Sequence, residues 1–221
     1  MTLKINLYGD TFLHNIVEGK ISSTDNQVPQ YVEFVTDGSG EINLFVDSGL
    51  FETDQLYSSK PNYGWMLESK SIRPDIFEYF SKDMKNKIAP FEKIFTHNNQ
   101  LIQKSSKFEF LHPIGYWVDS SINLNKTKLV SMITSNKKMT SLQKKRVKFA
   151  KKNIHKIDLF GKGFNFIDKK EDGLQKYCYS FAFENDDTDN YFSEKILDCF
   201  ATKTIPIYRG TKNIQNFFNK D

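Results

Sequence analysis

Short apolar runs alternate along this chain with segments that have the pattern of amphipathic helices, and this alternation restricts the fold more than any other feature. The runs INLFV (42–46), LVSMIT (129–134) and YSFAFE (179–184) have the length and the β-branched and aromatic content of buried strands. Residues 140–153 and 191–202 have the pattern of helices. Strands that alternate with helices predict a parallel sheet with crossover helices, and therefore an α/β fold.

The same alternation continues on both sides of a polar segment. Residues 119–128 (DSSINLNKTK) have no apolar period, which is typical of a linker. We therefore expect two small α/β domains, residues 1–123 and 124–221. DGSGE at 37–41 predicts a hairpin turn, because its glycines can adopt positive φ. The other predicted strands are 4–8, 31–35, 63–69, 91–97, 107–113, 157–163 and 204–208, and the other predicted helices begin near Pro74, lie between 97 and 107, and cover 213–218.

The composition excludes several classes of protein. The chain has 221 residues, of which 38% are apolar and 26% charged, and its net charge of +4 is low for a dedicated nucleic-acid binder but compatible with an anionic ligand. No segment approaches the roughly 20 apolar residues of a membrane helix, and the first ten residues lack the apolar stretch of a signal peptide, so we expect a cytoplasmic location. Cys178 and Cys199 lie within apolar runs and are expected to be free thiols. The four histidines lack zinc-site spacing.

The loop FENDDTDN leads from the strand 179–184 into a helix whose first turn contains Glu194 and Lys195. Parallel sheets bind ligands beyond the carboxyl ends of their strands, and the N-terminus of a helix attracts phosphate. Glutamate suits this position because it stabilises the helix dipole, whereas lysine is unfavourable there. A lysine in this place therefore suggests an anion that satisfies both the lysine and the helix; the alternative is an exposed, solvated side chain.

The helix 140–153 supplies a second basic feature. Most of its lysines are expected on a solvated face, but one of Lys144, Lys145 or Arg146 could turn toward the ends of the strands. Arginine suits phosphate better than lysine, because its planar fork offers two parallel hydrogen bonds. The segment contains only one aromatic residue, so nucleic-acid binding is the weaker interpretation.

Asp187-Thr188-Asp189 forms a D-x-D pattern, which could hold a divalent cation such as Mn²⁺ or Mg²⁺. The pattern is short and acidic loops are common. We therefore predict that the chain requires no metal cofactor.

The stretch YSFAFENDDTDNYFSEKILDCFATKTIPIYRG resembles the signature of glycosyltransferase family 10, the α1,3/4-fucosyltransferases. That signature consists of an apolar strand, F-E-N, a short loop, Y-x-x-E-K, a helix, and a strand of the form T-x-P-I/V-Y/V-x-G. KLVSMITSNKK is similar to the S-N segment that leads into the arginine-bearing helix of the family. The likeness is strong over residues 124–218, and looser over 63–123, where the chain resembles bacterial and viral members.

The resemblance implies a GT-B architecture with two Rossmann-like halves and a cleft between them. It implies GDP-fucose as donor, a glycan hydroxyl as acceptor, and inversion at the anomeric carbon. Carried over position by position, Arg146 and Lys195 would hold the donor's phosphates, Glu194 would accept the ribose hydroxyls, and Tyr191 would lie near the nucleotide.

The F-E-N pair, Glu184 and Asn185, would lie in the donor cleft by the same resemblance. Glu68, at the end of its strand in the first half, would be the catalytic base. Two alternatives stay open at this point. One is a transferase of the same fold that uses another nucleotide sugar. The other is a non-catalytic domain that binds glycans or nucleic acid through the basic helix 140–153.

Overall fold

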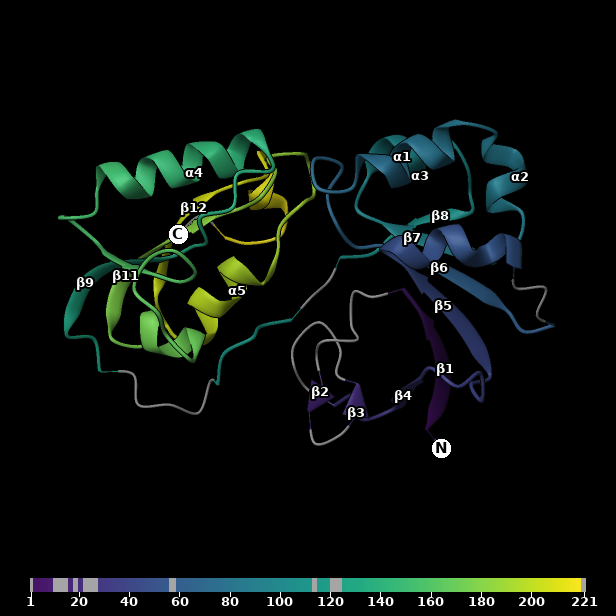
Figure 1. The fold of residues 1–221 in the computed structure, drawn as a ribbon, viewed down its shortest axis with the longest axis horizontal. Coiled ribbons are helices and arrows are strands. Elements are labelled where there is room, and N and C mark those ends of the chain that lie inside the picture. Colours follow the sequence, from purple (N-terminus) through teal and green to yellow (C-terminus); the bar gives the residue numbers. More distant parts are fainter. Residues whose placement is uncertain are drawn as a thin grey trace. The chain divides into compact units, whose positions relative to one another are not determined.

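The computed structural model describes residues 2–9, 16–17, 20–21, 28–55, 59–112, 115–119 and 125–219. The chain divides into two compact units, Met1–Pro113 and Ile114–Asp221, and each contains a parallel sheet with helices (Figure 1). The predicted α/β class with two parallel-sheet halves is confirmed. The predicted boundary between residues 123 and 124 stays a prediction, because residues 120–124 lie outside the described residues. Within the described ranges, no helix is long and apolar enough to cross a membrane.

The sheet of the N-terminal unit has six parallel strands in the order β4-β1-β5-β6-β7-β8. Its strands are β1 (Leu3–Tyr8), β4 (Val32–Val35), β5 (Ile42–Val46), β6 (Asn62–Met66), β7 (Lys93–Thr96) and β8 (Phe108–Phe110). A separate antiparallel pair is formed by β2 (Ile16–Val17) and β3 (Lys20–Ile21). All the strands predicted in this half are therefore present, and the last three are shorter than predicted.

The hairpin predicted at 37–41 is wrong, because β4 and β5 do not pair with each other. β1 lies between them and pairs in parallel with both, so the segment 36–41 carries the chain from one side of β1 to the other. Gly40 permits the close approach that this crossing needs. A Cβ at Gly40 would lie 2.5 Å from the backbone nitrogen of Asn6, and the Gly40 N–H donates to the Asn6 Oδ1 at 2.6 Å.

Helices cover one face of this sheet and bury the larger of its two apolar clusters. Phe77 and Phe80 pack with Phe45 and Ile94 of the strands. The single helix predicted after Pro74 is interrupted, because Asp83 adopts a left-handed backbone conformation with φ of 57°. The helical segments are η1 (Asp47–Gln55), α1 (Pro74–Ser81), α2 (Met84–Ile88) and α3 (Asn99–Ile102).

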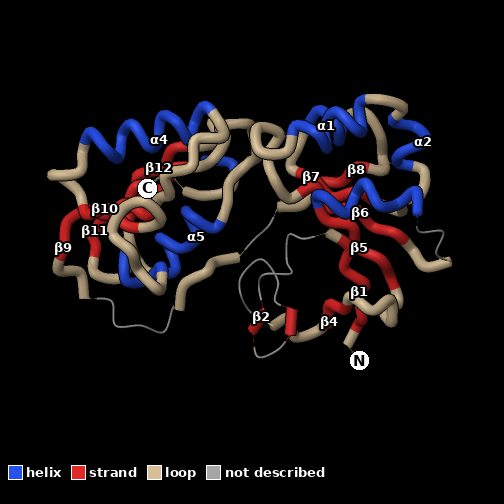
Figure 2. Tube along the Cα trace, in the orientation of Figure 1, coloured by secondary structure: helices blue, strands red, loops and turns tan. Residues whose placement is uncertain are grey.

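The C-terminal unit has four parallel strands in the order β10-β9-β11-β12, with helices on both faces (Figures 1 and 2). Alternate residues of β11 supply the two cores: Phe183 packs with Ala150 of α4, whereas Ala182 packs with Cys199 of α5. The last predicted helix is only a 3₁₀ turn. The elements are β9 (Lys128–Ile133), α4 (Ser141–Lys152), β10 (Asp158–Phe160), η2 (Lys170–Gly173), β11 (Tyr177–Phe183), α5 (Glu194–Ala201), β12 (Ile205–Arg209) and η3 (Ile214–Asn216).

A capping box begins α4 and ties it to the loop after β11. The Thr140 hydroxyl oxygen accepts the Gln143 N–H at 3.0 Å, and the Gln143 Oε1 accepts the Thr140 N–H at 3.3 Å. The same hydroxyl donates to the backbone oxygen of Asn185 at 2.7 Å. One side chain therefore fixes both the first turn of α4 and the start of the loop that follows β11.

A buried carboxyl, Asp47, closes the end of β5. Its backbone has a φ of 45°, and its Oδ1 accepts the N–H groups of Leu67 at 2.9 Å and Glu68 at 3.2 Å. Burial raises the pKa of Asp47 to about 6, although the Glu68 N–H opposes this shift, and the nearby Glu68 charge adds to it. Asp47 thus holds the backbone of the segment that carries Glu68.

We predict that Thr140→Ala lowers the free energy of unfolding of the C-terminal unit by about 1–2 kcal/mol, because the Gln143 N–H and the backbone oxygen of Asn185 both lose the Thr140 hydroxyl as partner. Thr140→Ser keeps the hydroxyl and should retain most of the stability. Urea denaturation followed by circular dichroism measures both. Equal losses in the two variants would contradict the assignment.

We also predict that Asp47 makes the N-terminal unit less stable as the pH rises. The folded pKa of about 6 lies above the ordinary value of 3.8, so the stabilisation from the protonated form is complete below pH 3.8 and is lost as the pH passes through 6. Asp47→Asn should remove this dependence, worth roughly 2–3 kcal/mol between the two limits. Urea denaturation of both proteins from pH 4.5 to 7.5 is the measurement, and parallel curves would refute the prediction.

Candidate functional site

Five of the residues selected from the sequence meet at the start of α5. Glu184 and Asn185 directly follow β11, Glu194 and Lys195 are the first two residues of α5, and Arg146 reaches the same place from α4. The Arg146 Nη1 lies 3.1 Å from the Asn185 Oδ1, and the Lys195 Nζ lies 3.4 Å from the Glu184 Oε2. This is the carboxyl edge of the parallel sheet, where α/β folds bind ligands.

Glu184 is the centre of this cluster. Its side chain is fully buried. Its Oε1 accepts the Ser193 N–H at 2.9 Å, and its Oε2 accepts the Ser193 hydroxyl at 2.8 Å and the Lys195 ammonium at 3.4 Å. Ser193 is a residue that the sequence analysis missed, and its signal was that serine often precedes the first residue of a helix. Glu184 therefore fixes the start of α5 and balances one positive charge there.

Lys195 is held on several sides. Its Nζ donates to the Ser193 Oγ at 2.8 Å and lies 3.8 Å from the Glu194 Oε1. Burial would lower the pKa of Lys195, but the Glu184 and Glu194 carboxylates outweigh it and raise that pKa, while the charge of Arg146 opposes them. Lys195 is therefore protonated at neutral pH. A lysine beside a helix N-terminus is unfavourable, because the helix dipole repels its charge. The buried Glu184 carboxylate offsets this repulsion.

Arg146 has donors without carboxylate partners. The side chain is buried, with 5% exposed, whereas Lys144 and Lys145 of the same helix are exposed. Its Nη1 donates to two uncharged oxygens, the backbone oxygen of Phe183 at 3.1 Å and the Asn185 Oδ1 at 3.1 Å. Within the described part of the chain, Arg146 forms no ion pair and its buried Nε has no hydrogen-bond partner. Burial lowers the pKa of Arg146, and Glu184 is the foremost of the nearby charges that raise it.

A buried arginine with an unpaired donor is suited to binding an anion. A buried donor without a partner is costly, and a buried charge is normally paired. Arg146 also lies close enough to Lys195 for the two charges to repel each other. An anion with several oxygens would satisfy both cations at once.

The acidic loop between β11 and α5 is stabilised by hydrogen bonds between one of its own side chains and its backbone. Asp186 is buried, and its Oδ1 accepts the N–H groups of Asp187 at 2.8 Å and Thr188 at 3.2 Å. Asp187 and Asp189, which form the D-x-D pattern, are exposed. Among the described residues, no group of three or more potential metal ligands occurs. Tyr191 belongs to the same loop, and its side chain is buried.

Glu68 belongs to the other unit. It follows β6, is partly exposed, and is held through its backbone by Asp47. It therefore lies at the carboxyl end of its strand, as the sequence predicted. Glu68 is part of the N-terminal unit, whereas the five residues that meet at the start of α5 are part of the C-terminal unit.

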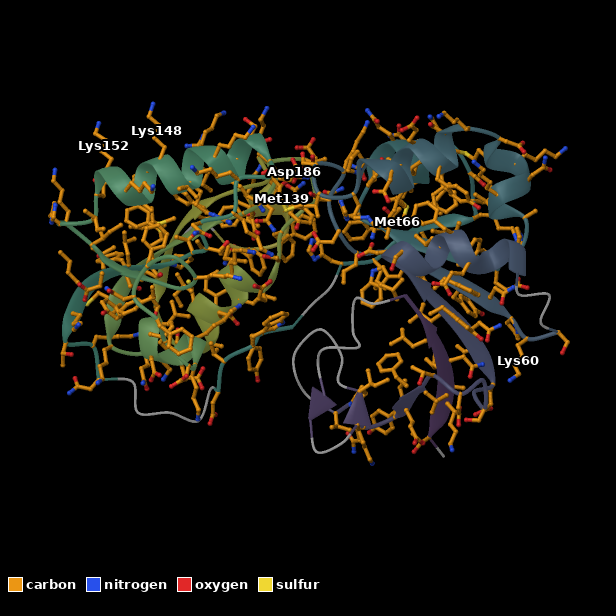
Figure 3. All side chains as sticks on the ribbon, in the orientation of Figure 1. Lys60, Met66, Met139, Lys148, Lys152 and Asp186 are labelled. Carbon is orange, nitrogen blue, oxygen red and sulfur yellow. The ribbon has the colours of Figure 1, made fainter. Side chains whose placement is uncertain are left out.

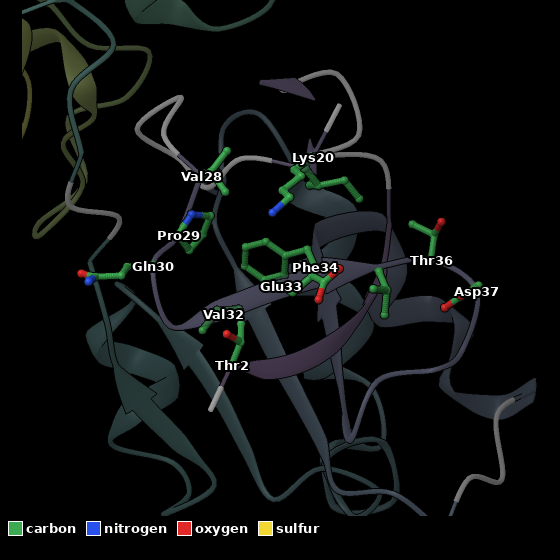
Figure 4. Close-up of a pocket in the computed structure, with 12 residues that line it drawn as sticks. Thr2, Lys20, Val28, Pro29, Gln30, Val32, Glu33, Phe34, Thr36 and Asp37 are labelled. Carbon is green, nitrogen blue, oxygen red and sulfur yellow. The ribbon is translucent and has the colours of Figure 1, made fainter. Parts of the chain in front are cut away.

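The N-terminal unit also contains a pocket of about 420 Å³ along the edge strand β4 (Figure 4). The ring of Phe34 forms part of its wall, and Lys20 and Glu33 bring opposite charges to it. None of the site residues predicted from the sequence lines this pocket.

The sequence of the C-terminal unit is similar to that of known glycosyltransferases. Residues 123–221 match the family model of the glycosyltransferase family 10 (fucosyltransferase) C-terminal domain. The alpha-(1,3)-fucosyltransferase FucT of Helicobacter pylori is 37% identical over 57 residues, which make up 26% of this chain and 12% of that protein. The chain thus matches a small part of that relative's length.

Solved structures share the fold of the whole chain. A crystal structure of an α1,3-fucosyltransferase superposes with a TM-score of 0.56 and 14% identity, covering 99% of this chain and 71% of the other. A crystal structure of an α1,3-fucosyltransferase with GDP-fucose gives a TM-score of 0.54 at 14% identity and the same coverage. At this identity the likeness concerns the fold. It extends to both units, and together with the family match it leads to one conclusion: this chain has the GT-B-like fold of the α1,3-fucosyltransferases, and its residues 123–221 resemble the C-terminal domain of glycosyltransferase family 10.

Proposed function

We propose that this chain is a fucosyltransferase that transfers fucose from GDP-fucose to a hydroxyl group of a glycan. The observation that carries the proposal is the pair of neighbouring cations at the start of α5, one of which, Arg146, has a buried donor without a partner in the described part of the chain. The match of residues 123–221 to the fucosyltransferase family model and the fold shared with a GDP-fucose complex support the choice of donor.

The donor's diphosphate would bind between Arg146 and Lys195. The Nε of Arg146 would donate to one phosphate oxygen, and the ammonium of Lys195 would face the other phosphate. Glu194 would accept hydrogen bonds from the ribose hydroxyls, and Tyr191 would line the nucleotide site. Glu184, which is fully buried, would act by holding Lys195 and Ser193 in position.

The reaction would be a single displacement with inversion. The acceptor oxygen attacks C1 of fucose while the bond from C1 to the diphosphate oxygen breaks, and the acceptor's proton passes to the Glu68 carboxylate. GDP leaves with the bonding electrons, so its negative charge grows in the transition state. Arg146 and Lys195 would stabilise this charge more strongly in the transition state than in the ground state, which is what accelerates the step.

The same cations would make a metal ion unnecessary. Metal-dependent transferases neutralise the leaving diphosphate with a divalent cation, and here two fixed side chains would have that role. We therefore propose that the exposed Asp187 and Asp189 are not required for transfer.

A thermal-shift panel tests the proposal and its alternatives. We expect GDP and GDP-fucose to raise the melting temperature of the C-terminal unit, and UDP and dTDP to have little effect, because at equal concentration a ligand that binds the folded state more tightly stabilises it more. Hydrolysis of GDP-fucose without an acceptor would then report turnover. A shift with another nucleotide would indicate a different nucleotide sugar. No shift with any nucleotide, combined with salt-sensitive binding of polyanions, would overturn the proposal.

We predict that Lys195→Ala lowers kcat for fucose transfer by roughly 10²-fold or more, because the variant loses a donor to the leaving group. Lys148→Ala is the matched control, because Lys148 is exposed and points away from α4 into solvent (Figure 3). The control should have wild-type kcat. Circular dichroism should first confirm that both variants are folded. Near-normal turnover in Lys195→Ala would then exclude the role given to Lys195.

A further inference from the structure

Lys170 of η2 contacts two carboxylates of α5. Its Nζ lies 2.9 Å from the Glu194 Oε1 and 2.9 Å from the Asp198 Oδ2. Glu194 and Asp198 are four residues apart, so they share one face of the helix, and like charges at this spacing repel each other. Lys170 is therefore the cation that allows both carboxylates to face the same side. The mechanism proposed above makes no use of it.

Lys170 is itself held from two sides. Its ammonium lies 4.5 Å from the centre of the Trp117 ring. The backbone N–H of Trp117 donates to the Asp198 Oδ1 at 2.6 Å. At the other end of η2, the backbone oxygen of Gly173 accepts the Ser131 hydroxyl of β9 at 2.6 Å. These contacts anchor η2 to the sheet. Side-chain exposure is 27% for Lys170 and 3% for Asp198, so the ion pair is shielded from solvent.

The Glu194 carboxylate has two lysines beside it at unequal distances. The Lys170 Nζ lies 2.9 Å from its Oε1, whereas the Lys195 Nζ lies 3.8 Å from the same oxygen. Lys170 is thus the nearer of the two lysines to Glu194, and it is the one that forms a hydrogen bond with this carboxylate. Lys195 is engaged more closely by Ser193 and Glu184, although its charge also lowers the pKa of Glu194.

From this geometry we propose that Lys170 is a positioning residue: it fixes the Glu194 carboxylate so that its second oxygen accepts the ribose hydroxyls, and it thereby sets the preference for a ribonucleotide. The proposal rests on the function proposed above. A Glu194 without this partner is repelled by Asp198 and loses its fixed orientation. Affinity for the ribose hydroxyls would fall, while contacts to the base and the diphosphate would remain.

The test compares the Kd of GDP with that of 2′,3′-dideoxy-GDP by calorimetry. The wild-type chain should prefer GDP, and Lys170→Met should reduce this preference by about tenfold, the value of a hydrogen bond to a charged group. The Kd of the dideoxy compound should change far less. Lys170→Arg should restore the preference, because it keeps the charge. Lys169→Met, at the exposed neighbouring position, is the matched control and should behave as wild type.

A double-mutant cycle separates positioning from general stability. Glu194→Gln should lower the same preference, and adding Lys170→Met should cause no further loss if the two act as a unit. Should Lys170→Met not fold, Lys170→Gln carries the same test. An unchanged preference, or an equal loss of both nucleotides, overturns the inference. A wild-type chain that binds no GDP overturns the proposed function, and this inference with it; a chain that binds GDP without the Lys170 effect overturns the inference alone.

Discussion

A single fully buried carboxylate, Glu184, organises the charged end of the C-terminal unit. It accepts hydrogen bonds from a backbone N–H, a hydroxyl and an ammonium, and all three donors belong to the two residues Ser193 and Lys195. A buried charge is tolerated only when it is paired and hydrogen-bonded, so this arrangement fixes the start of α5 rigidly. It also lets a lysine occupy a helix end that would otherwise repel it.

The charges around this carboxylate are distributed so that one cation has no ionic partner among the described residues. Lys170 pairs with Glu194 and Asp198, and Lys195 pairs with Glu184 and, at a longer distance, with Glu194. Arg146 contacts only uncharged oxygens within the described residues, and its Nε remains without a partner there. Parallel strands bring these groups together, because the ends of β9, β11 and β12 and the start of α5 lie along the same edge. The fold supplies the position, and within the described residues the distribution of ion pairs leaves Arg146 without an ionic partner.

Much of this could be predicted from the sequence, and the failures have local causes. The strands of both sheets followed from apolar runs. The choice among Lys144, Lys145 and Arg146 was left open, and the structure places only Arg146 on the buried face of α4. The break at Asp83 depends on one residue in a left-handed conformation, and the false hairpin at 37–41 depends on the insertion of β1 between β4 and β5. Ser193 was missed because its partner lies nine residues away, and Lys170 because it meets α5 only after η2 has packed on the sheet.

The central claim is that Arg146 and Lys195 together receive a diphosphate, and a series of guanine ligands measures it most directly. Calorimetric titration of GDP, GMP and guanosine into the wild-type chain and into Arg146→Met separates the phosphate contribution from that of the base and ribose. The account predicts that wild-type affinity falls by about tenfold or more with each phosphate removed, and that Arg146→Met loses most of the advantage of GDP over guanosine. Guanosine binding as tightly as GDP, or an Arg146→Met variant with the full advantage, would contradict it.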